Sequence, residues 1–156
     1  MMRRIVDLDV RDMLRAKQEP FERIMETVSC LEPEDVFQLH ATFRPDPLIR
    51  VLGRQGYQST VVQEGEEHFI VQFYREETER PFFRLDNRGL EPPEPMMRTL
   101  NFLEQHPECQ AGELGLEIWN ERVPAFLLPE LEERGYRYDI EQEESGTVRV
   151  KIYRAQ

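Results

Sequence analysis

The chain of 156 residues carries 31 acidic and 20 basic residues, which gives a net charge of −11 at pH 7. Because the acidic excess repels phosphate backbones and no segment is strongly basic, we expect no nucleic-acid binding. The sequence has neither an apolar run long enough to span a bilayer nor the apolar core of a signal peptide, so we expect a cytoplasmic protein without membrane contact.

The second half of the sequence repeats the first. With an offset of 79 residues, positions 45–75 and 124–154 share ten identities in 31 positions. Average residue usage would give about two by chance. Nearer the N-terminus, Glu19-Pro20 corresponds to Glu94-Pro95 at an offset of 75. The repeat predicts two tandem domains, 1–76 and 82–156, joined by a charged linker over 77–81.

Each copy is predicted to form strand, helix, strand, helix, strand and strand, in that order. In the first copy the expected elements are strands 5–10 and 36–40, a helix opening at Glu19-Pro20, a helix over 47–55, and a hairpin of 57–63 with 68–75. In the second copy they are strands 83–87 and 114–119, a helix opening at Glu94-Pro95, a helix over 124–134, and a hairpin of 136–142 with 147–154. Proline suits a first helical turn, and Gly56 and Gly135 are expected to end the second helices in a left-handed conformation.

Alternating apolar residues indicate a sheet with one buried face. In the last strand of the first copy, Phe69, Val71 and Phe73 alternate with polar residues. The first helices are expected to face the sheet through rows of apolar residues at helical spacing, namely Phe21, Met25 and Val28, and Met96, Leu100 and Leu103. The sequence therefore predicts an α+β fold of two tandem two-layer sandwiches, each a four-stranded mixed sheet with two helices on one face. The other sheet face is expected to be open to solvent or to a partner. A second copy of the chain is one such partner, which would form a homodimer through the open sheet faces.

Familiar catalytic motifs are missing from the sequence. It has no glycine-rich phosphate loop, no Cys-x-x-Cys, no His-Glu-x-x-His and no Ser-His-Asp arrangement. We expect no catalytic residue, no cofactor and no metal site. His68 and His106 are expected on the surface, and Cys30 and Cys109 as two free thiols.

Candidate binding residues in the first copy cluster where a strand ends and a helix begins. His40 ends the second strand, and it could meet Arg11, Lys17 and Arg44 at one end of the domain. Helix N-termini attract anions there. The competing interpretation is ordinary helix-entry and loop polarity, and Asp9 is expected to pair locally with Arg11.

The second copy has Arg88, Trp119, Asn120 and Arg122 at matching places. Trp119 suits either a core position or a platform for a ligand. Asp86 is expected to pair locally with Arg88, as Asp9 does with Arg11.

The residues Leu85-Asp86-Asn87-Arg88-Gly89-Leu90 followed by Pro93-Glu94-Pro95 resemble the TusA/SirA-type sulfur carriers of bacteria. In those carriers a Cys-Pro-x-Pro motif opens the first helix, and its cysteine holds a persulfide. Here Pro92 occupies the carrier position in the second copy and Lys17 in the first. The resemblance therefore implies the fold without the thiolate chemistry.

A fuller resemblance is to the bacterial domain of unknown function 2249. It rests on Leu85–Met96, on Arg122-Val123-Pro124, on the Gly-Tyr pairs at 56–57 and 135–136, and on the closing strand up to Arg154. Such domains occur beside haemerythrin-like and nitrogen-oxide respiratory proteins. The resemblance implies an accessory role in redox or metal-related processes.

Two hypotheses of function follow. The first is a non-catalytic accessory protein that binds a protein partner or a small ligand at the strand-end and helix-start regions or at the open sheet faces. The second is sulfur or metal-cofactor handling related to the TusA-like carriers, in redox chemistry or nitrogen-oxide respiration. Only Cys30 and Cys109 could carry sulfur.

Overall fold

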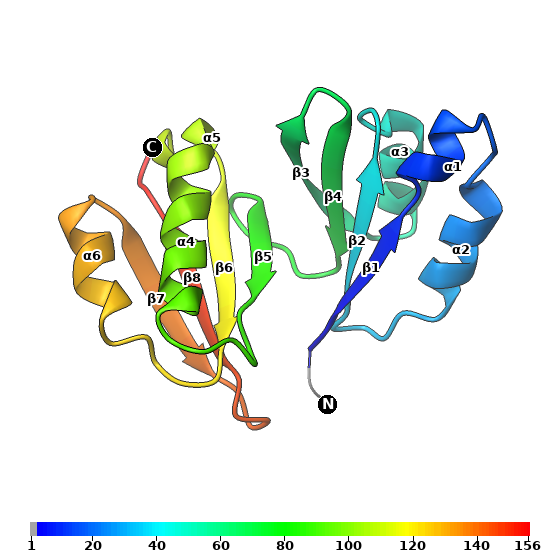
Figure 1. Cartoon of the computed structure of the whole chain (residues 1–156). Coiled ribbons are helices and arrows are strands. Elements are labelled where there is room, and N and C mark those ends of the chain that lie inside the picture. The colour runs from blue at the N-terminus through cyan, green and yellow to red at the C-terminus, as the bar shows by residue number, and fades with distance from the viewer. Residues whose placement is uncertain (1–2) are drawn as a thin grey trace. The chain divides into compact units, whose positions relative to one another are not determined.

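A computed structural model describes residues 3–156, and its chain divides into two compact units (Figure 1). The first unit is Arg3–Glu77, and the second includes Thr78–Gln156. We call them copy one and copy two. The division falls at one end of the predicted linker.

Copy one contains the predicted elements and one more. Its elements are β1 Ile5–Asp9, α1 Arg11–Arg15, α2 Phe21–Ser29, β2 Val36–Ala41, α3 Asp46–Arg54, β3 Gln58–Gly65 and β4 His68–Tyr74. The short helix α1 was not predicted. It occupies the extra residues between the first strand and Glu19, and its Met13 and Leu14 pack on the core.

Copy two likewise contains one helix beyond the prediction. Its elements are β5 Phe82–Asp86, α4 Glu94–Gln105, α5 Pro107–Gln110, β6 Gly115–Asn120, α6 Leu127–Glu133, β7 Arg137–Gln142 and β8 Val148–Tyr153. The extra helix is α5, which buries Cys109. A second difference is that α6 begins at Leu127, three residues after the predicted start at Pro124.

The two sheets have the same topology, which confirms the predicted α+β fold. Strand orders are β1-β2-β4-β3 and β5-β6-β8-β7. In each sheet the first two strands run parallel, and the remaining neighbours are antiparallel. A parallel pair needs a crossover, and α2 and α4 provide it.

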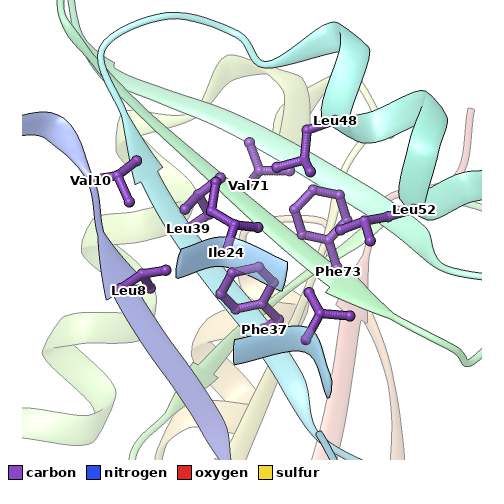
Figure 2. Packing of buried hydrophobic residues seen from close by; sticks show 10 residues of the cluster. Leu8, Val10, Ile24, Phe37, Leu39, Leu48, Leu52, Val71 and Phe73 are labelled. Carbon is purple, nitrogen blue, oxygen red and sulfur yellow. The ribbon is translucent and has the colours of Figure 1, made fainter. Parts of the chain in front are cut away.

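The core of copy one lies between its sheet and its helices (Figure 2). From the sheet come Leu8, Val10, Phe37, Leu39, Val71 and Phe73, and from the helices Ile24, Val28, Leu48 and Leu52. The predicted face of α2 was partly wrong, because Phe21 is 48% exposed while Ile24 is buried. In copy two, Leu103 is buried as predicted, together with Thr99 and Phe102.

The glycines that follow α3 and α6 have the predicted left-handed backbone. Gly56 has φ +94° and Gly135 has φ +85°. Tyr57 and Tyr136 then return a backbone hydrogen bond to Leu52 and Leu131. This matching turn ends both helices.

None of the helices formed by residues 3–156 combines the length and the apolar character that a bilayer crossing requires.

The packing predicts an asymmetric response to truncation in copy one. Leu52 has no exposed surface, so Leu52→Ala is expected to lower the free energy of unfolding of copy one by about 2–5 kcal/mol. Phe43 is 51% exposed, and Phe43→Ala is the matched control, expected within about 0.5 kcal/mol of the parent. Native-state hydrogen exchange of the copy-one amides measures the change in the free energy of unfolding for both variants. Equal losses in the two variants would contradict this packing.

Candidate functional site

Copy two has a pocket where the first two strands end and the long helices begin. Because β5 and β6 run parallel, their carboxyl ends meet at one edge of the sheet. The pocket has a volume of about 560 Å³. Its lining comes from both strand-to-helix connections, namely Asn87, Leu90, Pro92, Pro93, Pro95, Met96, and 120–127.

One wall of the pocket is the connection between β6 and α6. The Pro124 carbonyl accepts backbone hydrogen bonds from the amides of Leu127 (3.0 Å) and Leu128 (3.3 Å), which form a turn that leads into α6. Val123 and Phe126 lie on this turn, and Phe126 is 88% exposed. The late start of α6 therefore leaves an exposed apolar rim beside the pocket.

The opposite wall is the start of α4, which is poor in hydrogen-bond donors. Proline has no N–H, and prolines occupy positions 92, 93 and 95. The amide of Glu94 donates to the carbonyl of Glu91 (2.9 Å), and the amide of Met97 to that of Pro93 (3.0 Å). This helix start therefore offers the pocket mainly apolar proline rings rather than an anion-binding nest.

A chain of hydrogen bonds fixes two asparagines at the inner end of the pocket. Arginine can only donate, so Arg98 Nη1 identifies its partner, 3.3 Å away, as Asn87 Oδ1. The Nδ2 of Asn87 then donates to Thr99 Oγ1 (3.3 Å) and to Asn120 Oδ1 (3.4 Å). The Thr99 hydroxyl in turn donates to the Pro95 carbonyl (2.8 Å). Each amide thus has one defined orientation.

Arg122 lies on the same wall and is exposed. Within residues 3–156 it makes neither a hydrogen bond nor an ion pair. Its neighbour Glu121 is engaged, because Glu121 Oε1 accepts the amide of Gly89 at 2.8 Å. The pocket therefore has one uncommitted cation at its edge.

The other two candidates of copy two lie together elsewhere. Arg88 forms the predicted pair with Asp86 (2.9 and 3.0 Å), donates to Thr147 Oγ1 (3.0 Å), and lies over the Trp119 ring at 5.1 Å. Trp119 is buried, as expected of a large aromatic residue, but it points to the sheet face opposite Ile118 because side chains alternate along β6.

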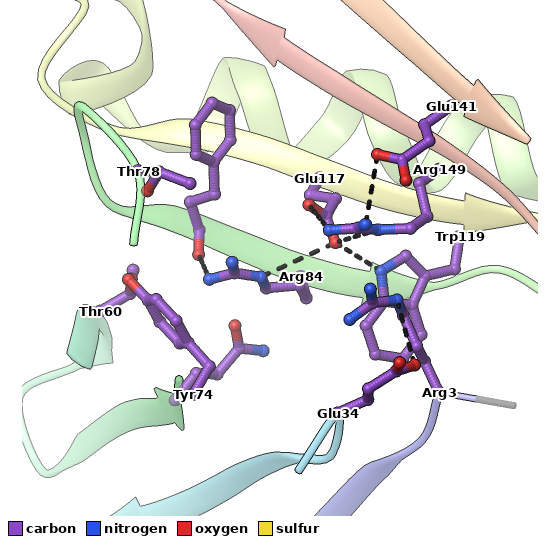
Figure 3. Close-up of polar contacts among 12 residues, drawn as sticks. Arg3, Glu34, Thr60, Tyr74, Thr78, Arg84, Glu117, Trp119, Glu141 and Arg149 are labelled. Carbon is purple, nitrogen blue, oxygen red and sulfur yellow. Dashed lines mark hydrogen bonds and ion pairs between the residues drawn. The ribbon is translucent and has the colours of Figure 1, made fainter. Parts of the chain in front are cut away.

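An ionic network accompanies Trp119 on that sheet face (Figure 3). Glu117 accepts a hydrogen bond from Trp119 Nε1 at 2.7 Å and forms ion pairs with Arg149 (3.1 Å) and Arg84 (3.8 Å). Arg149 also reaches Glu141 at 3.4 Å. Trp119 is therefore held as part of a polar network.

The candidates of copy one form their hydrogen bonds and ion pairs with other residues. Arg11 pairs with Asp9 at 2.7 Å, as predicted, and Arg44 pairs with Asp46 at 2.7 Å. Lys17 follows α1 in a left-handed conformation with φ +59°. In the described part of the chain, no hydrogen bond or ion pair joins any two of Arg11, Lys17, His40 and Arg44.

His40 instead belongs to a row of three polar side chains. Its Nε2 lies 2.7 Å from Asp7 Oδ1, and its Nδ1 lies 2.9 Å from Nε2 of His68. His68 is half-buried in this row. Burial, followed by the charges of Arg11 and His40, lowers the pKa of His68. Its neutral form is therefore favoured in the folded state.

The remaining histidine and one of the two cysteines are buried. The prediction of a surface position for His106 was wrong, because it is buried, stacked on Phe102 at 3.9 Å, and bonded through Nδ1 to the Phe102 carbonyl (2.8 Å). Both cysteines are free thiols, as predicted. Burial raises the pKa of Cys109 to about 12, whereas Cys30 is exposed at the end of α2. Among residues 3–156, no three or more His, Cys, Asp or Glu side chains gather as a metal site would require.

Comparison with known proteins identifies the family. The family model described as uncharacterised conserved protein DUF2249 matches residues 7–75 and again residues 84–154. The chain belongs to the DUF2249 family. Each of the two matches lies within one of the two compact units. No curated protein and no solved structure matches the chain.

Sequence reasoning missed most of the residues that shape the pocket of the second DUF2249 copy. In the sequence, Asn87, Thr99 and Arg98 are ordinary polar residues near a predicted helix. Only the structure shows that hydrogen bonds link them. A usable signal was present in the prolines at 92, 93 and 95, whose missing N–H groups indicate a helix start without anion donors.

The Arg11–Asp9 pair predicts a specific dependence on pH. Hydrogen bonds from Arg11 lower the pKa of Asp9 to about 2, from an ordinary value of 3.8. The pair therefore contributes stability above about pH 4, and that contribution is lost as the pH falls through the folded-state pKa. Arg11→Gln is expected to return the pKa of Asp9 towards its ordinary value, as measured by carboxyl ¹³C NMR titration. Arg54→Gln, at an exposed site of α3, is the control, and an unchanged Asp9 pKa in Arg11→Gln would show the pairing to be wrong.

Proposed function

We propose that the protein is a non-catalytic binding protein of the bacterial cytoplasm, and that the copy-two pocket holds a small apolar ligand. The observation that carries this proposal is the pocket itself. Its volume of about 560 Å³ lies in the range of small-molecule sites, and leucine, methionine, valine, phenylalanine and four prolines line it.

The rim of the pocket supports the same function. Phe126 and Val123 are exposed apolar residues on its edge, and Met97 is exposed one residue beyond the lining residue Met96. Exposed apolar groups that adjoin a concave apolar surface are typical of binding sites. A ligand in the pocket would cover part of this surface.

The fold suggests how such a site arose. We infer that each copy has the TusA/SirA-like fold, because both sheets share one strand order with a parallel first pair, and copy two also has the Pro-x-Pro helix start. Pro92, at the carrier position, lines the pocket. In this interpretation an apolar pocket replaces the reactive cysteine of the carriers.

The sulfur-handling alternative has less support. Neither Pro92 nor Lys17 has a thiol, and the pKa of about 12 keeps Cys109 in its unreactive protonated form. Cys30 lies at the far end of α2 from the helix start. Among residues 3–156, the His, Cys, Asp and Glu side chains form no group of three or more that would support a metal-handling role.

The proposal predicts that a neutral apolar dye binds in copy two. N-phenyl-1-naphthylamine should bind the full chain with increased fluorescence. Val123→Glu places a charge on the apolar wall, so it should weaken dye binding about tenfold or more, because an apolar dye that covers this carboxylate would remove it from water.

Phe43→Glu is the control, since Phe43 is an exposed aromatic residue of copy one. It should leave dye affinity unchanged. If the parent does not bind the dye, or if both variants weaken binding equally, the pocket is not the binding site.

A further inference from the structure

We propose, on the basis of the function proposed above, that the ligand of the copy-two pocket is a monocarboxylic acid with an apolar body, and that Asn120 and Arg122 bind its carboxylate. The apolar walls alone do not distinguish a hydrocarbon from an acid. The polar groups at the inner end and at the edge of the pocket favour the acid.

Asn120 supplies a prepared donor. Its side chain is 8% exposed and lines the pocket. Arg98 fixes Asn87, and Asn87 fixes Asn120 Oδ1 as an acceptor, so the Nδ2 group of Asn120 is turned away from that network. In the described part of the chain this Nδ2 has no hydrogen-bond partner. An acceptor on the ligand would satisfy it.

Arg122 supplies the charge. It follows Asn120 by two residues on the same wall, and its guanidinium is uncommitted within residues 3–156. A carboxylate that accepts from Asn120 Nδ2 and pairs with Arg122 has a donor at each end of its O–C–O unit. Arginine suits such planar anions.

The surroundings favour a single negative charge over a dianion. The prolines leave the start of α4 with few N–H donors, so a phosphate would lack the usual helix-end contacts. Glu91 and Glu94 are exposed beside this helix start, and Glu121 is part of the lining. These carboxylates repel additional negative charge, which disfavours a dianion in the pocket.

The test compares ligands that share one apolar body. Isothermal titration of the full chain at pH 7.5 uses octanoate, 1-octanol and octyl phosphate, each below its aggregation threshold. Octanoate is expected to bind about tenfold more tightly than 1-octanol, and octyl phosphate more weakly than octanoate.

Two variants separate anion recognition from the apolar pocket. Arg122→Gln is expected to reduce octanoate affinity to that of 1-octanol and to leave 1-octanol binding unchanged. Asn120→Asp keeps the acceptor towards Asn87 but removes the donor, so it should weaken octanoate about tenfold with 1-octanol within twofold. Arg54→Gln, an exposed arginine outside the pocket, should change neither.

The outcomes are distinguishable. Equal binding of octanoate and 1-octanol, or an Arg122→Gln variant that still prefers octanoate, would overturn the carboxylate assignment while leaving the apolar pocket standing. Binding of none of the three ligands would overturn the proposed function as well. An acetylated Leu-Leu-Phe peptide with a free C-terminus that binds more tightly than octanoate would assign the site to a peptide terminus and overturn the free acid.

Discussion

The structure depends on one pairing, the parallel contact of the first two strands in each copy. Parallel neighbours cannot be joined by a hairpin, so a helix must cross between them. That crossover brings both strand ends to one edge of the sheet and starts two helices there. In copy two this single constraint gathers Asn87, Asn120 and the prolines of α4 around one volume, although more than 30 residues separate the two asparagines.

The two copies share one topology but differ in what fills the region where strands end and helices begin. Copy two leaves a pocket between its strand ends and helix starts, because α6 begins late and α4 begins with prolines. Copy one inserts α1 between its first strand and α2, and Met13 and Leu14 of that helix join the core. Several of its polar side chains pair with one another there, with Arg11 on Asp9 and His40 between Asp7 and His68. Duplication has therefore preserved the topology while the contents of the helix-start region have diverged.

Much of the fold could be predicted from the sequence, because strand alternation, helix-opening prolines and paired glycines are local signals. The turn at Gly56 and Gly135 is an example, since the left-handed conformation needs glycine. The short helices α1 and α5 could not be predicted from the sequence, because packing determines them more than a periodic pattern of apolar residues does. His106 was misassigned because only tertiary structure places Phe102 against its ring. The sequence indicated Arg122 as a candidate binding residue. The orientation of the Asn120 amide, however, follows from hydrogen bonds through Arg98 and Asn87 that no sequence pattern encodes.

The central claim is that copy two holds an apolar acid at its strand ends. Amide NMR of the ¹⁵N-labelled full chain, titrated with octanoate, tests it most directly because every residue other than proline has a backbone amide signal of its own. The account predicts shifts confined to residues 87–96 and 120–127, with the side-chain amide of Asn120 and the Nε–H of Arg122 among the largest. Shifts spread over the chain, or centred on copy one, would contradict it.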